Sequence, residues 1–188
     1  RGLPPGAVRA VGTNTLRVAK NAREFMPRFE AALGFPIEVV AGREEARLIY
    51  LGVSHSLPAS MDKRLVVDIG GGSTEFIIGA GNQPHRLESL YMGCVSYSLR
   101  YFPEGRIGKS NLKQAELAAR IEIEAIKRQF SRKHWQEAVG SSGTARAIGD
   151  ILEANGWGAE GISRDGMEWL RSALLKAGDA SRVALPGL

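Results

Sequence analysis

The sequence predicts a mixed α/β fold, and two patterns support this prediction. Short apolar runs typical of strands alternate along the chain with longer amphipathic segments typical of helices. Between residues 65 and 91 a strand-loop-strand-turn-strand pattern indicates a hairpin, which places antiparallel neighbours in the sheet. The alternation and the hairpin together predict a mixed sheet rather than an all-parallel one.

The first elements are short and are delimited by recognisable end signals. Strands are expected at residues 8–11 and 37–40, and helices at residues 13–20, 22–33 and 44–50. Asn21 is a typical N-cap with Glu24 three residues later, as in a capping box. Gly34 is a typical residue after a helix end, and Pro27 predicts a kink inside the same helix.

The later elements follow the same alternation. Strands are expected at residues 65–69, 75–78, 87–91 and 137–139, and helices from about Ser110, up to about Glu153, and from Ser163 to near Gly178. The helix from Ser110 is predicted from an apolar stripe that recurs at spacings of three and four residues. The stripe consists of Leu112, Ala115, Ala119, Ile123, Ile126 and Phe130.

The composition is that of an ordinary soluble globular protein, with 44% hydrophobic and 24% charged residues. No apolar run reaches the roughly 18 residues that a membrane span needs, and no signal segment opens the chain. The single cysteine, Cys94, excludes an internal disulfide and a cysteine-based zinc site. We therefore predict a cytoplasmic protein that is neither secreted nor in a membrane. Its net charge of +5 is compatible with an anionic substrate.

The strongest chemical signal is the segment at residues 68–75, Asp-Ile-Gly-Gly-Gly-Ser-Thr-Glu. Three glycines between two apolar strands allow backbone N–H groups to approach an anion closely, and two hydroxyl groups follow as further donors. The expected phosphate contacts are Gly70, Gly71, Gly72, Ser73 and Thr74. Asp68 is expected to hold a divalent metal, and Glu75 to orient a water molecule or join the metal's ligands.

A second turn of small residues enters the helix after residue 139. Ser142, Gly143 and Thr144 are candidate contacts for an anion or a nucleotide at a helix N-terminus. A simple strand-to-helix turn capped by Ser142 or Thr144 explains the same residues equally well.

Other polar residues give weaker signals. The three histidines are too scattered in sequence for a metal site. Among the basic residues, Arg17, Arg23, Arg43 and Arg47 precede the glycine segment, and one or two of them are candidate phosphate contacts. The basic residues near the long helix are explained by a solvated face, and nothing favours nucleic-acid binding.

The segment at residues 68–75 resembles the second phosphate loop of the exopolyphosphatase/guanosine pentaphosphate phosphohydrolase family, within the actin/hexokinase/Hsp70-like superfamily. The segments Gly-Arg-Glu-Glu-Ala-Arg-Leu-Ile-Tyr at residues 42–50, Met-Gly-Cys-Val-Ser at residues 92–96 and Ser-Gly-Thr at residues 142–144 are similar to family motifs. Residues 15–17 and 21–25 are similar to the helical segment that approaches the site. The resemblance covers nearly the whole chain.

The resemblance implies a ribonuclease-H-like fold, a mixed sheet flanked by helices, with a two-domain core present only in part. Residues 1–50 correspond to the end of a first domain and residues 51–188 to much of a second. The family's first phosphate loop and the part after Leu188 are absent, so we expect a fragment.

The resemblance also implies an activity, the hydrolysis of a terminal phosphoanhydride with Mg²⁺ or another divalent cation. Glu45 corresponds to the residue that activates the attacking water, and Glu75 is a second catalytic candidate. Inorganic polyphosphate is the favoured substrate and guanosine pentaphosphate the alternative. A non-catalytic alarmone-binding module and a kinase of the same superfamily remain open, as does a homodimer. No nucleic-acid or membrane partner is expected.

Overall fold

The computed structural model describes residues 4–159 and 161–188. The N-terminal unit contains β1 (Ala10–Gly12), α1 (Asn14–Val18), α2 (Ala22–Leu33) and β2 (Ile37–Val39), preceded by the 3-10 turn η1 (Pro5–Ala7). Helix α3 (Gly42–Ser56) leads into the larger unit, which contains β3 (Arg64–Ile69), β4 (Thr74–Ala80), β5 (Gln83–Leu90), α4 (Cys94–Tyr101), α5 (Lys109–Glu124), β6 (Glu137–Ser141), α6 (Ser142–Ala154) and α7 (Arg164–Ala177). The short turns η2 (Pro103–Gly105), η3 (Arg132–His134) and η4 (Ala180–Arg182) lie between or after these elements.

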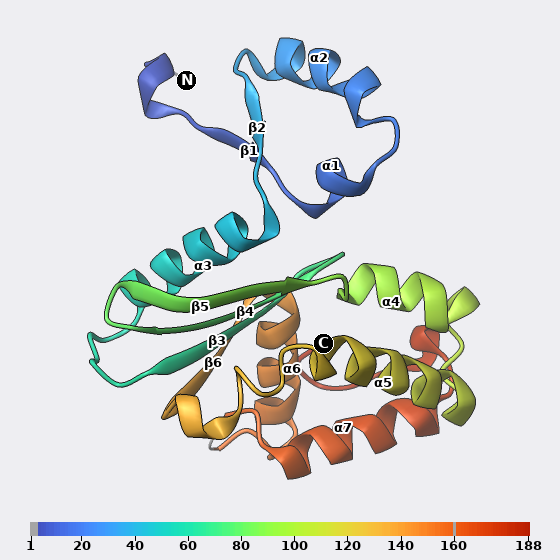
Figure 1. Cartoon of the computed structure of the whole chain (residues 1–188). Helices are drawn as coiled ribbons and strands as arrows, with labels where there is room; N and C mark the ends of the chain where they lie inside the picture. The colour runs from blue at the N-terminus through green and yellow to red at the C-terminus, as the bar shows by residue number, and fades with distance from the viewer. Residues whose placement is uncertain (1–3, 160) are drawn as a thin grey trace.

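The larger unit is built on a four-stranded mixed sheet with the order β5-β4-β3-β6. Strand β3 is antiparallel to β4 and parallel to β6, and β4 is antiparallel to β5. Figure 1 shows α3 across one face of the sheet, with α4, α5 and α7 on the other side. The mixed α/β fold predicted from the sequence is confirmed.

Each face of this sheet has its own apolar core. On the side of α3, Val66 and Ile77 are fully buried against Ala46 and Tyr50. On the opposite side a second cluster lies under α4, α5 and the turns that follow α5. This cluster contains Leu65, Ile78, Leu90, Met92, Ile126 and Phe130. Because β3 and β4 are covered on both faces, they form the most deeply buried part of the molecule.

Two glycines allow α3 to approach the sheet closely. A Cβ atom on Gly79 would lie 2.4 Å from the Tyr50 ring, and one on Gly42 would lie 2.6 Å from Cβ of Ser89. The Tyr50 hydroxyl donates a hydrogen bond of 3.1 Å to the Gly81 carbonyl. These close contacts fix α3 against β4 and β5, and so fix the position of the side chains at the start of α3.

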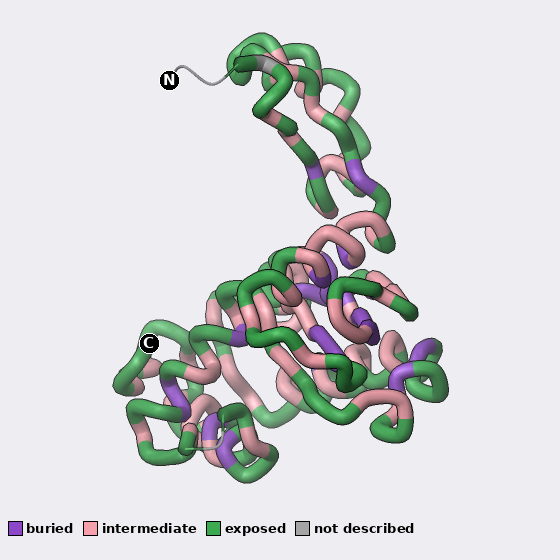
Figure 2. Tube along the Cα trace, turned by 90° about the vertical axis from the view of Figure 1, so that its left-hand side faces the viewer, coloured by how far each residue is buried: buried purple, intermediate pink, exposed green. Residues whose placement is uncertain are grey.

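The N-terminal unit is far less buried. Its two strands form a separate parallel sheet, and α2 has no buried residue. Figure 2 shows this unit standing apart from the larger unit, in which most buried segments are found. Among the described residues, no helix is both long enough and apolar enough to cross a membrane.

Most predicted elements are present, with three corrections. The apolar stripe predicted a helix as far as Phe130, but α5 ends at Glu124 and hydrogen-bonded turns carry Ile126 and Phe130 into the core. Helix α4 was not predicted. Asn21 occupies the N-cap position of α2, but its side chain makes no capping hydrogen bond. Pro27 lies within α2, whereas Ser163 and Gly178 bound α7 as predicted.

Candidate active site

The glycine loop (residues 70–73) joins β3 to β4, and the first turn of α4 binds it through hydrogen bonds. The Gly70 carbonyl accepts a hydrogen bond of 2.9 Å from the Cys94 amide. The Gly71 carbonyl accepts bonds of 2.9 and 3.0 Å from the amides of Val95 and Ser96. The N-terminal amides of α4, which have no partner inside the helix, thus bind the loop carbonyls and fix its shape.

The loop also contains backbone N–H groups that have no acceptor. Within the described residues, the amides of Gly71, Gly72 and Ser73 donate no hydrogen bond. Gly72 is partly buried and Ser73 is buried, and buried amides normally have an acceptor. Three successive amides without an acceptor form a suitable anion site. The loop can therefore bind phosphate oxygens through its backbone, as the sequence suggests.

Gly93 explains how α4 comes so close to the loop. A Cβ atom at this position would lie 2.4 Å from the Gly72 nitrogen and 2.5 Å from the Gly71 carbonyl oxygen. These neighbours are backbone atoms that cannot rotate away, so only glycine fits. Gly93 is thus part of the construction of the site, although it contacts no substrate.

Two carboxylates flank the loop and lie opposite each other. Asp68 on β3 pairs with Glu75 on β4 in the antiparallel register, and Glu75 pairs in turn with Ser89 on β5. Directly opposed residues of antiparallel strands point to the same face, with Cβ atoms about 5 Å apart. This is the face covered by α3, because Val66 and Ile77 lie two residues further along the same strands.

Glu75 is a buried carboxyl group, only 1% exposed. Burial raises the pKa of Glu75, hydrogen bonds from Ser89 and Ser73 act in the opposite direction, and the charges of Glu45 and Asp68 raise it further. The Ser89 hydroxyl donates a bond of 2.7 Å to Glu75 Oε1. The effect of Glu45 and Asp68 on this pKa reflects how close the three carboxylates lie.

Helix α3 places Glu45 near Asp68 and Glu75, on the face of the sheet that α3 covers. Glu45 precedes Ile49 by one helical turn and shares the sheet-facing side of α3. Glu45 Oε2 lies 2.6 Å from Arg17 Nη1, and this nitrogen also donates a bond of 3.0 Å to the Val40 carbonyl. The two side chains are only 13% and 16% exposed, so the ion pair fixes the orientation of the Glu45 carboxylate. Glu44 instead pairs with Arg47 on the same helix.

The loop and Glu45 meet in a cleft of about 390 Å³. The cleft is also lined by Thr13, Asn14 and Thr15 and, on α4, by Val95, Ser96 and Leu99. The sequence indicates only that residues 15–17 belong to a segment approaching the site and that residues 92–96 resemble a family motif; it does not single out Thr13, Asn14 or Leu99. A Cβ atom on Gly72 would lie 1.9 Å from the Asn14 amide nitrogen, so Asn14 packs directly on the loop. Asn14 Oδ1 is buried without a hydrogen-bond partner in the described residues.

Other predicted contacts lie outside this cleft. The Thr74 hydroxyl donates a bond of 2.6 Å to the Met92 carbonyl and is buried. Ser142 has a left-handed backbone with φ of 75°, and its hydroxyl donates a bond of 3.3 Å to the Ile69 carbonyl. Gly143 and Thr144 follow in α6 and, like Ser142, do not line the cleft. The structure thus brings together Glu45, Asp68, Glu75 and the glycine loop, while residues 142–144 lie beside the end of β3.

The carboxylates provide a suitable but incomplete set of magnesium ligands. Among the described residues, no group of three or more His, Cys, Asp or Glu side chains forms a metal cage. Magnesium is commonly held by one or two carboxylates together with water and substrate phosphates, so this does not conflict with a magnesium site. Burial is the main cause of the raised pKa of Glu75, and a bound cation would relieve the smaller contribution from the charges of Glu45 and Asp68. Asp68 and Glu75 are the candidate ligands beside the glycine loop, although neither lines the cleft itself.

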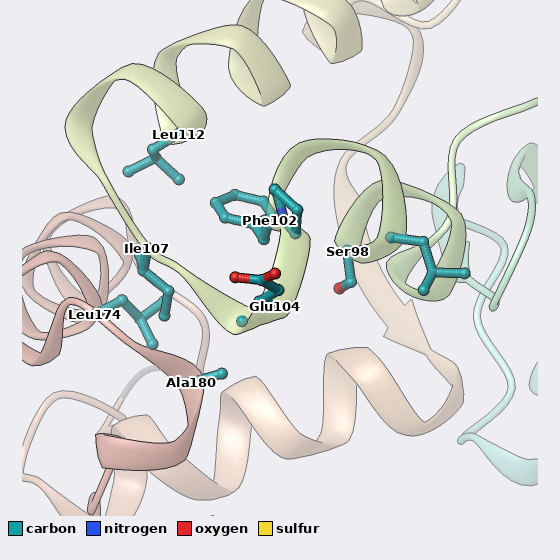
Figure 3. Close-up of a pocket in the computed structure, with 10 residues that line it drawn as sticks. Ser98, Phe102, Glu104, Ile107, Leu112, Leu174 and Ala180 are labelled. Atoms are coloured by element: carbon teal, nitrogen blue, oxygen red, sulfur yellow. The ribbon is translucent and has the colours of Figure 1, made fainter.

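A larger hollow of about 700 Å³ lies on the other side of α4 but lacks comparable chemistry. Figure 3 shows its walls, which include Phe102, Ile107, Leu112 and Leu174, with Glu104 among them. The Glu104 carboxylate is paired with Arg106 at 2.6 Å. The smaller cleft is therefore the candidate active site, because of its backbone donors and the Glu45 carboxylate and not because of its volume.

Known proteins resemble this chain over most of its length. Residues 1–188 match the family model described as the Ppx/GppA phosphatase family. The Aquifex aeolicus PPX-GPPA enzyme is 32% identical with a TM-score of 0.61, over 79% of this chain and 47% of its own. An exopolyphosphatase-like protein is 29% identical with a TM-score of 0.71, over the same shares, 79% and 47%.

A third structure extends the match in fold. An exopolyphosphatase from Cytophaga hutchinsonii has a TM-score of 0.79 at 24% identity, over 96% of this chain and 60% of its own. The chain therefore spans about half the length of the first two structures and somewhat more of the third. The match to the family model over all 188 residues agrees with the resemblance found in the sequence, and the chain belongs to the Ppx/GppA phosphatase family.

Proposed function

We propose that this protein hydrolyses the terminal phosphoanhydride bond of inorganic polyphosphate with the help of a divalent cation. The observation that carries this proposal is the meeting of Glu45 with the three free amides of the glycine loop in one cleft. The loop provides donors for phosphate oxygens, and Glu45 provides a carboxylate in the same cleft that can accept a proton from water.

The proposed reaction is an in-line displacement on the terminal phosphate. The amides of Gly71, Gly72 and Ser73 bind its oxygens, and Glu45 accepts a proton from water as the water oxygen attacks phosphorus. The bond from phosphorus to the bridging oxygen breaks, and the shortened chain leaves with that oxygen. Mg²⁺, held by Asp68 and Glu75, would neutralise negative charge on the phosphates.

Arg17 has two roles in this proposal. Its Nη1 orients Glu45 and binds the Val40 carbonyl, and its remaining N–H groups donate no bond within the described residues. A guanidinium has five donors in a rigid plane, so Arg17 can orient the base and contact a phosphate oxygen simultaneously.

The proposal is tested by comparing Glu45→Gln with Glu44→Gln. These neighbours on α3 make the same change of charge, but Glu44 pairs with Arg47 outside the cleft. Phosphate release from polyphosphate is measured with Mg²⁺ and with chelator. We expect Glu45→Gln to lower kcat at least about 100-fold with little change in KM, and Glu44→Gln to retain activity. Equal effects of the two substitutions would contradict the role of Glu45.

A parallel assay with guanosine pentaphosphate separates the two substrates, because both are phosphoanhydrides that the cleft can accept. Release from the nucleotide alone would transfer the assignment to guanosine pentaphosphate. Binding of both compounds without release of phosphate at any metal concentration would indicate a non-catalytic binding module.

A further inference from the structure

A second site rich in positive charge lies away from the cleft. We call it the basic pocket; it is lined by Arg86, Glu124, Arg128, Gln129, Lys133 and His134 and has a volume of about 500 Å³. Its residues come from β5, from the end of α5 and the turns after it, and from η3. Two parts of the chain that are distant in sequence, β5 and residues 124–134, thus contribute to one concave surface.

The positive charges of the basic pocket are not neutralised by the protein. Within the described residues, Arg86, Arg128 and Lys133 form no ion pair. The only carboxylate in the lining, Glu124, is bound at 3.1 Å by Lys127, which lies outside the lining. Like charges gathered in this way repel one another and create a local positive potential that an anion would relieve.

The geometry of the basic pocket is partly fixed. Arg86 Nη1 donates a bond of 2.5 Å to the Gln129 carbonyl, which ties β5 to the turns after α5. Burial and the positive charges of Arg86, Lys133 and Lys63 lower the pKa of His134, while a hydrogen bond to the Arg128 backbone acts in the opposite direction. Burial is the largest cause of this lowered pKa, and the contributions of Arg86 and Lys133 reflect how near their charges lie to His134.

The basic pocket is separate from the proposed active site. Arg86 pairs with Ile78, and Ile78 with Leu65 near the start of β3, whereas the glycine loop begins at Gly70. Five residues of strand correspond to a separation on the order of 15 Å. Figure 1 agrees, because the turn before β6 lies at the end of β3 opposite to the glycine loop.

We propose that the basic pocket is a second anion site that binds phosphate groups, independently of the glycine loop. Arg86 from β5 and Arg128 and Lys133 from residues 124–134 suit phosphate, because guanidinium groups bind its oxygens in pairs and the lysine adds a further positive charge. The source is either free phosphate or part of an oligophosphate chain. The proposal goes beyond the proposed function, since neither Glu45 nor the glycine loop takes part in it.

The test is binding followed by NMR, with inorganic phosphate and with tripolyphosphate as separate probes and chelator present. Amides of residues 125–134 report the basic pocket, and amides of residues 70–73 report the glycine loop. We expect at least one probe to shift the first group, and Arg128→Gln/Lys133→Gln to weaken this binding about tenfold or more at low salt. The relative affinity of the two probes identifies the source of the phosphate.

The control is Lys109→Gln/Lys113→Gln, which removes two positive charges at the opposite end of α5. This variant should retain the shifts at residues 125–134. Equal weakening by both variants, or no shift at these residues with either probe, would overturn the proposal. Shifts at residues 125–134 without shifts at residues 70–73 would support the second site. If residues 70–73 also stay unshifted when the titration is repeated with Mg²⁺ in place of chelator, the result counts against the proposed function, so the two proposals can fail separately.

Discussion

At the scale of single residues, the burial of Glu75 gives the protein a distinct dependence of stability on pH. The pKa of Glu75 is raised from its ordinary value of 4.5, so the folded state holds this proton more strongly than the unfolded state does. Stability from this group is therefore fully present below pH 4.5 and is lost as the pH rises through the raised value. We expect Glu75→Gln to increase the free energy of unfolding near pH 8 more than near pH 4, measured by urea unfolding.

The Glu75→Gln variant removes the charge of this group but keeps its packing. A glutamine can still accept the hydrogen bond from Ser89, so the packing of β4 and β5 is retained. Glu153→Gln, at an exposed position on α6, serves as the control. A pH profile of stability that is identical in wild type and Glu75→Gln would show that the buried carboxyl does not set this dependence.

Arg17 and Arg9 offer a comparison of two arginine–glutamate pairs with different burial. Arg17 and Glu45 are 13% and 16% exposed, whereas Arg9 and Glu38 are 57% and 56% exposed. We expect Arg17→Gln to destabilise the fold by about 1–3 kcal/mol, because Glu45 loses its partner in a partly desolvated place. Arg9→Gln should change stability by less than about 0.5 kcal/mol. Similar values from urea unfolding would show that the Arg17–Glu45 pair is effectively solvated.

At the scale of elements, the position of α4 depends on Gly93. A Cβ atom there would collide with backbone atoms of the glycine loop, so Gly93→Ala should destabilise the protein by about 2 kcal/mol and displace the loop. Gly149 in α6 has free space around its Cα, and Gly149→Ala should stabilise by about 0.5–1 kcal/mol through helix propensity. Thermal unfolding of the two variants measures both effects, and a neutral Gly93→Ala would contradict the close contact.

The elements also show what the sequence could and could not predict. Gly34 and Gly178 end helices with left-handed backbones, as local chemistry predicts. The end of α5 was misplaced because Ile126 and Phe130 are buried by turns that keep the helical spacing. Helix α4 was missed because it has only eight residues, and its apolar residues Val95, Tyr97, Leu99 and Tyr101 recur at every second position, a spacing typical of a strand.

The sequence predicted only the part of the candidate site that is formed by neighbouring residues. The glycine loop and its carboxylates are adjacent in sequence, so their chemistry can be recognised locally. Thr13, Asn14 and Thr15 reach the cleft from the other unit, and no local pattern indicates a contact between segments more than 50 residues apart. The resemblance to a family supplied Glu45, whereas the pairing of Glu45 with Arg17 needed the structure.

At the scale of the whole molecule, the two units differ in how much apolar surface they bury. The free energy of local unfolding should therefore differ between them. Helix α2 has no buried residue, whereas β3 and β4 are covered on both faces. Hydrogen exchange should therefore be faster in α2 than in β3 and β4, because opening the N-terminal unit exposes little apolar surface. Mass spectrometry of exchanged peptides measures this difference.

Phosphate binding should then couple the two units. Because the cleft is lined by Thr13, Asn14 and Thr15 on one side and by the glycine loop on the other, a bound oligophosphate contacts both units. A ligand that binds only the closed arrangement stabilises it, so exchange in residues 13–18 should slow when tripolyphosphate is added. Arg17→Gln removes the link to Glu45 and Val40 and should speed exchange there before ligand is added. Unchanged exchange in residues 13–18 with ligand present, while the glycine loop becomes protected, would mean that the substrate binds to the larger unit alone.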